Sequence, residues 1–79
     1  MNIENELILL ISQFFQKNMK DINLETTQND IEEWDSLEHI KLVLEIESKF
    51  GVRFPLEIIP KLTSVKNIVE ELKKLKNNI

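Results

Sequence analysis

The stretch Trp34-Asp35-Ser36-Leu37-Glu38-His39-Ile40, residues 34–40, decides how the chain folds. A polar segment ends here and a helical pattern of apolar residues begins. The Asp35 carboxylate suits a helix cap, and Glu38, three residues later, can complete a capping box. Ser36 falls in the first turn and points outward. A phosphate on its oxygen would lie at the positive end of the helix dipole, so the position suits a tether better than a catalyst.

The length of 79 residues predicts a single domain, residues 1–79, with a small core and no deep active site. The absence of cysteine excludes disulfides and thiolate chemistry from the protein's own side chains. Acidic residues stand near the start, where a signal peptide has basic ones, and no apolar run approaches membrane-spanning length. We therefore expect a cytoplasmic protein, and a monomer.

Charge disfavours nucleic acids and anionic membranes as partners, because 14 acidic residues against 10 Lys and Arg give a formal charge of −4. Residues 21–40 contain no Lys or Arg. Half of the carboxylates lie in this quarter of the chain, namely Asp21, Glu25, Asp30, Glu32, Glu33, Asp35 and Glu38. They predict an acidic surface around Ser36.

Apolar spacing predicts the helices. Steps of three and four predict a helix over residues 3–17, with Ile3, Leu7, Ile8, Leu10, Ile11, Phe14 and Phe15. A second helix is expected over residues 36–50, with Leu37, Ile40, Val43, Leu44, Ile46 and Phe50 facing inward. Gly51 is its expected stop, because glycine adopts the left-handed conformation without steric cost.

Two connections join these helices to the rest of the chain. The long polar loop over residues 18–35 should be pinned to the bundle by Ile22, Leu24, Ile31 and Trp34. Pro55 predicts a short helical turn over residues 56–59, limited by Pro60.

Thr63 or Ser64 should cap a last helix whose apolar stripe is Val65, Ile68, Val69, Leu72 and Leu75. The fold class is all-α, a small four-helix bundle of three longer helices and a short one.

Three other kinds of functional site could be built from the residues in and near the 34–40 stretch. A hydrolase built on Ser36, His39 and Asp35 lacks the sharp glycine turn that supports a nucleophile and an oxyanion hole. A calcium loop starting at Asp30 has Trp34 at its fifth position, where an oxygen ligand is required. A lone His39 is more often a packed polar residue than a metal ligand, so we predict no metal site and no catalytic residue. A plain helix cap without chemistry also accounts for Asp35-Ser36 taken alone.

The wider pattern resembles the acyl carrier protein family. It comprises Asp35-Ser36-Leu37-Glu38-His39-Ile40, Ile46-Glu47, Phe50-Gly51-Val52, Pro55 and a fourth helix of the form TSV…IV…L, and covers essentially the whole chain. The resemblance implies that Ser36 carries a phosphopantetheine arm, installed from coenzyme A by a phosphopantetheinyl transferase that uses magnesium. The arm's thiol holds acyl groups as thioesters, so the carrier itself is not an enzyme.

The same resemblance implies partners and a pocket. Acyl-loading, acyl-modifying and acyl-transferring enzymes would dock through basic patches onto Asp35, Leu37 and Glu38, with Glu45 and Glu47 as weaker candidates. Inward residues would form a pocket for the acyl chain, with Ile46, Phe54, Ile59 and Leu62 as candidates, although ordinary core packing explains each of these equally well.

Departures from the family pattern favour a dedicated biosynthetic pathway. Lys41, Lys49 and Arg53 place positive charge where fatty-acid carriers are acidic, and Trp34 and Phe54 are bulkier than the usual residues. Because docking is steered by charge, these changes should alter which enzymes are accepted. The alternatives are primary fatty-acid synthesis, an aminoacyl or peptidyl carrier, and an unmodified helical adaptor.

Overall fold

Three α-helices form the bundle in the computed structural model, which describes residues 2–77. They are α1 (Ile3–Phe15), α2 (Ser36–Phe50) and α3 (Val65–Asn77). The 3-10 turns η1 (Met19–Asp21) and η2 (Gln28–Asp30) lie before α2, and η3 (Ile59–Lys61) lies before α3. Met1 and residues 78–79 of the predicted domain lie outside the described residues. No strand occurs within residues 2–77, which confirms the predicted all-helical class.

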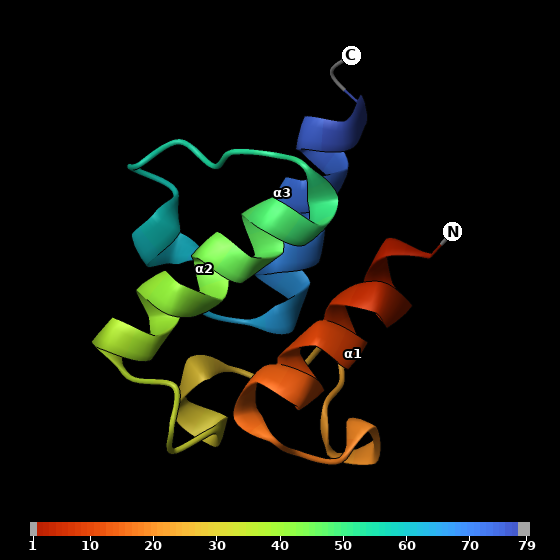
Figure 1. Ribbon diagram of the computed structural model, residues 1–79, viewed down its shortest axis with the longest axis vertical. Coiled ribbons are helices and arrows are strands. Elements are labelled where there is room, and N and C mark those ends of the chain that lie inside the picture. Colours follow the sequence, from red (N-terminus) through yellow and green to blue (C-terminus); the bar gives the residue numbers. More distant parts are fainter. Residues whose placement is uncertain (1, 78–79) are drawn as a thin grey trace.

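The helices pack around one core, with α1 against both α3 and α2. The connection from α1 to α2 crosses the lower end of the bundle, and the connection from α2 to α3 swings out and returns beside α2 (Figure 1). Fully buried side chains come from all three helices and from the turn before α3, and include Leu7, Ile11, Leu42, Ile46, Leu62, Ile68 and Leu72.

Helix α1 ends two residues earlier than predicted. Gln16 adopts the left-handed conformation at φ 55°, although it is not glycine. The N–H of Gln16 donates to the carbonyl of Gln13 at 3.3 Å, and the N–H of Lys17 donates to the carbonyl of Ser12 at 2.8 Å, so carbonyl groups at the helix end are satisfied. The apolar spacing ends at Phe15, the last residue of α1, but no glycine marks the stop at Gln16.

Helix α2 has the predicted bounds and the predicted stop. Gly51 closes it at φ 65°, and the N–H of Val52 donates to the carbonyl of Glu47 at 3.1 Å. The predicted inward face was partly wrong, because Leu37, Ile40 and Leu44 are 63%, 49% and 60% exposed. Val43, Ile46 and Phe50 are buried as predicted, together with His39 and Leu42, which the predicted face did not include. The buried sector of α2 is therefore shifted from the one that its apolar pattern suggested.

The long loop is pinned as predicted. Ile22, Ile31 and Trp34 are buried in the core, and Leu24 packs against it. Backbone hydrogen bonds tie the loop to the start of α3: the N–H of Gln28 donates to the carbonyl of Thr63 at 2.7 Å, and Val65 donates to Thr26 at 3.0 Å. The loop is therefore a fixed part of the bundle.

The short element before α3 is displaced from its predicted range. A turn at residues 56–58 leads into η3, and i to i−3 hydrogen bonds are donated by Ile58, Ile59, Lys61 and Leu62. Pro60 lies inside η3 instead of limiting the turn, because a residue without an N–H is tolerated at the start of a helical turn. Ser64 is the cap of α3, since its Oγ accepts from the N–H of Asn67 at 3.1 Å.

Candidate functional site

Ser36 is the first residue of α2 and is exposed. Asp35 precedes it in an extended conformation, and its Oδ1 accepts from the N–H of Glu38 at 2.8 Å. The N–H groups of the first helical residues have no intrahelical acceptors. The Ser36 hydroxyl therefore projects into solvent at the positive end of α2.

Only half of the predicted capping box forms. The N–H of Asp35 donates to the carbonyl of Glu33 at 3.0 Å, and so is not available to Glu38. The Glu38 carboxylate instead pairs with Lys41 at 3.4 Å, one turn along α2. Glu38 is half-buried, and Lys41 partly neutralises the acidic surface at this point.

His39 is buried and bonded at both ring nitrogens. Trp34 Nε1 donates to His39 Nδ1 at 2.8 Å, and His39 Nε2 lies 2.8 Å from the carbonyl of Ile59. The two rings stack with centroids 6.0 Å apart. Both nitrogens are engaged away from Ser36, so His39 is not placed to act as its general base. The sequence predicted a packed polar residue here but carried no signal for either partner.

An ion pair fixes the loop just before the site. Lys17 Nζ lies 3.2 Å from Glu33 Oε1. A hydrogen bond from the backbone of Glu33, and then the Lys17 ammonium, hold the pKa of the Glu33 carboxyl below its usual range. Glu33 is thus a negative charge at neutral pH, beside the Asp35-Ser36 pair.

An open apolar groove of about 800 Å³ lies between α2 and the segment that follows it. Two of the four predicted pocket residues, Phe54 and Ile59, line it. The structure places Ile46 in the core instead. The remaining lining comes from residues that the sequence did not assign to a pocket, namely Ile40, Val43, Leu44, Glu47, Arg53, Pro55 and Leu56. Ile40 and Leu44, which are exposed on α2, therefore form part of one wall of the groove.

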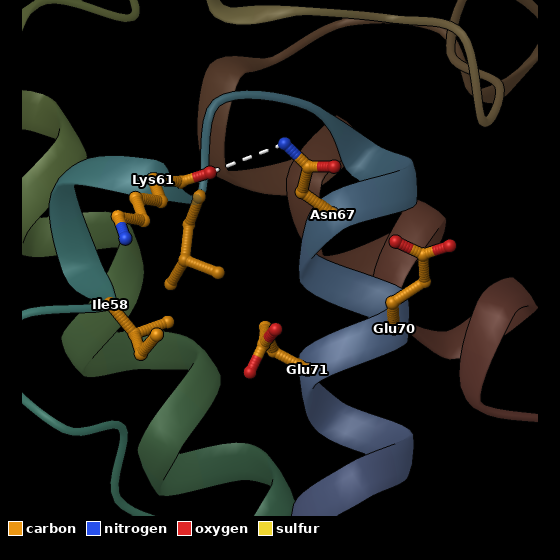
Figure 2. A pocket seen from close by; sticks show the side chains of 6 residues that line it. Ile58, Lys61, Asn67, Glu70 and Glu71 are labelled. Carbon is orange, nitrogen blue, oxygen red and sulfur yellow. Dashed lines mark hydrogen bonds between the residues drawn. The ribbon is translucent and has the colours of Figure 1, made fainter.

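Leu62 lies in a second, smaller cavity of about 210 Å³ between η3 and α3. Figure 2 shows this cavity, where Asn67 of α3 faces the backbone of η3. Asn67 Nδ2 donates to the carbonyl of Lys61 at 3.2 Å, which ties η3 to α3. Glu70 and Glu71 also line the cavity, so its walls are more polar than those of the groove.

The predicted recognition residues divide into two groups. Asp35, Leu37 and Glu45 are exposed at the surface of α2 and its cap. Glu38 and Glu47 are half-buried, and Glu47 Oε2 accepts from the N–H of Phe54 at 2.7 Å. Glu47 therefore holds the segment after α2 against the helix, a structural contact that spacing along the sequence could not indicate.

Within residues 2–77, no cluster of three or more His, Cys, Asp or Glu residues is arranged to hold a metal ion. In the same part of the chain, no helix is both long and apolar enough to cross a membrane.

Comparison with known proteins now identifies the family. Residues 5–72 match the family described as "Phosphopantetheine attachment site". Two relatives named "Acyl carrier protein", from Rickettsia bellii strains RML369-C and OSU 85-389, are each 30% identical over 76 residues. These residues are 96% of this chain and 88% and 94% of the relatives.

A solved structure agrees with this assignment. The solution structure of a holo acyl carrier protein from Geobacter metallireducens matches with a TM-score of 0.83 at 29% identity, covering 96% of this chain and 87% of that one. The chain therefore belongs to the acyl carrier protein family, whose members carry a covalent phosphopantetheine group and are carriers, not catalysts.

Proposed function

We propose that Ser36 is the residue that carries the phosphopantetheine arm and that the chain holds acyl intermediates on the arm's thiol as thioesters. The observation that supports this most is the exposed Ser36 hydroxyl at the first position of α2. The N-terminus of α2 fits the phosphodiester of the arm, because unpaired N–H groups and the helix dipole favour a negative group there.

Attachment is a phosphoryl transfer catalysed by a separate transferase. The Ser36 oxygen forms a bond to the phosphorus that bears pantetheine in coenzyme A, and the diphosphate P–O bond breaks. Adenosine 3′,5′-bisphosphate leaves, and the hydroxyl proton passes to a base of the transferase. The resemblance implies that magnesium, held by the transferase, assists this step.

Intact mass after incubation with coenzyme A and a broad-specificity transferase tests this assignment. We expect a gain of one phosphopantetheine in the wild type and none in Ser36→Ala. The matched control is Ser48→Ala, which removes an exposed hydroxyl from the same helix. A gain in mass that persists in Ser36→Ala would show that the arm is attached at another residue. No gain in mass with several transferases would favour the unmodified adaptor.

The groove beside α2 is the proposed shelter for the acyl chain. Ile40 and Leu44 line it one and two turns after Ser36, which is about 6 and 12 Å along the helix axis at 1.5 Å per residue. Its walls are mainly apolar, as an alkyl chain requires. Phe54 and Ile59 form part of the opposite side.

Docking to partner enzymes is proposed to use Asp35, Leu37 and Glu38 first, with Glu45 and Glu47 contributing less. The family's partners, a phosphopantetheinyl transferase and enzymes that handle acyl groups, would present basic patches to this surface. Leu37 is 63% exposed and adds an apolar contact beside the acids. Further along α2, Lys49 interrupts the run of acidic side chains, and its Nζ lies 3.8 Å from Glu6 Oε1 of α1.

A dedicated biosynthetic pathway is the proposed setting, because Lys41, Lys49 and Arg53 change the charge that partners meet. Arg53 and Lys49 are both exposed. Restored growth of cells that lack their own fatty-acid carrier would refute this proposal and favour primary fatty-acid synthesis. Failure to restore growth, with normal expression and modification, is the expected result. The cytoplasmic location and monomeric state expected from the sequence remain predictions.

A further inference from the structure

His39 connects three segments that carry the proposed function. Trp34 lies two residues before Ser36, His39 lies in the first turns of α2, and Ile59 lines the apolar groove. We call this chain of two hydrogen bonds the His39 bridge. Trp34 and His39 are 2% and 6% exposed, so the bond between them is buried, and the bond from His39 to Ile59 is partly buried.

The donors and acceptors in the bridge are determined by chemistry. An indole N–H can only donate, so His39 Nδ1 must accept from Trp34. The proton of the neutral ring is then on Nε2, which donates to the Ile59 carbonyl. Each bond therefore favours the tautomer that the other needs, and together they fix the orientation of the ring.

The Ile59 carbonyl holds η3 toward α2. Its other partner is the N–H of Leu62 at 3.2 Å, a bond within the turn itself. On the opposite side, η3 is tied to α3 by the exposed bond from Asn67 to the carbonyl of Lys61 (Figure 2). His39 thus supplies a partly buried side-chain bond between α2 and the Ile59 wall of the groove.

We propose that His39 is a positioning residue that sets how closely the Ile59 wall approaches α2, and thereby which acyl chain lengths the groove protects. This inference rests on the proposed function, in which the groove shelters cargo bound to the Ser36 arm. Directional bonds made by a buried side chain specify a geometry that apolar packing alone would leave adjustable. Loss of one such bond changes a conformational equilibrium by a factor of about 2 to 10.

Three variants separate this role from general stability. His39→Phe keeps an aromatic ring but removes both bonds, whereas Trp34→Phe removes the indole donor and part of the ring but leaves the bond from His39 to Ile59. Ile11→Val is the matched control, because it weakens the core from α1 at a residue that does not line the groove. Circular dichroism confirms that each variant is folded before it is compared.

The measurement is the protection of thioesters against hydroxylamine. Each protein is loaded from butyryl- or octanoyl-coenzyme A by a broad transferase, and loading is confirmed by intact mass. The readout is the cleavage rate of the butyryl form divided by that of the octanoyl form. A merely structural role for His39 would leave this ratio unchanged, because it would affect both chains alike.

We expect the ratio to change by about threefold or more in His39→Phe, in the same direction but less in Trp34→Phe, and not in Ile11→Val. A wild-type ratio in folded His39→Phe would overturn the inference. If that variant does not fold, a wild-type ratio in Trp34→Phe would overturn it instead. A protein that gains no mass from either coenzyme A derivative would refute the proposed function itself, and the inference with it.

Discussion

Asp35 combines a structural contact with a charge, and two substitutions separate them. Its Oδ1 accepts from the N–H of Glu38 at 2.8 Å, and its exposed carboxylate is part of the proposed docking surface. Asp35→Ala removes the cap and the charge together. Asp35→Asn keeps an oxygen in the capping position and removes only the charge.

The expected loss of stability differs between the two variants. Loss of the cap in Asp35→Ala should cost about 1 kcal/mol, within a range of about 0.5–2 kcal/mol. For a domain of this size, 1 kcal/mol lowers Tm by about 4–8 °C. In Asp35→Asn only the interaction between the charge and the helix dipole is lost, so the cost should be about 0.3–1 kcal/mol, and Tm should fall less.

Thermal unfolding followed by circular dichroism measures the stability, and the initial rate of phosphopantetheine transfer measures docking. Both variants should be modified more slowly than the wild type, because both lack the charge that a basic transferase surface attracts. The difference from the wild type should shrink as salt is added, since screening weakens the wild-type attraction.

Two results would refute this reasoning for Asp35. Equal losses of Tm in the two variants would show that the hydrogen bond to Glu38 does not stabilise α2. A wild-type transfer rate in Asp35→Asn would show that the charge plays no part in docking.

Three further predictions follow from the geometry. Glu38→Lys should slow modification more than Glu45→Lys, and an equal or reversed ranking in transfer rates would contradict docking through the first turn. Gly51→Ala should lower the free energy of unfolding by about 1–2 kcal/mol in denaturant titrations, because alanine is strained at φ 65° although nothing lies within 4 Å of its Cβ. Because the pKa of Glu33 is lowered in the folded protein, its ionised carboxylate stabilises the fold at pH values above the usual carboxyl pKa. This stabilisation is lost as pH falls through the lowered pKa. The difference in free energy of unfolding between the wild type and Glu33→Gln should therefore disappear in acid.

Local chemistry accounts for the features that the sequence determined. The bounds of α2, its stop at Gly51 and the exposed position of Ser36 depend on residues within one or two turns of each other. The pinned loop was also predictable, because isolated apolar residues in a polar segment have few places to lie except the core. The resemblance to a carrier followed from the same local spacing.

Only the tertiary structure decided which way α2 is turned and what its side chains meet. An apolar stripe indicates a helix, but the sector that becomes buried depends on how neighbouring helices approach, so Leu42 lies inside and Leu44 lines a groove. The bond that Phe54 N–H donates to Glu47 and the bond from His39 to Ile59 join residues 7 and 20 positions apart. Such contacts depend on where the backbone returns, and no periodicity in the chain records that. The 34–40 stretch therefore predicted the attachment site at Ser36, while the position of the groove wall beside it depends on the fold.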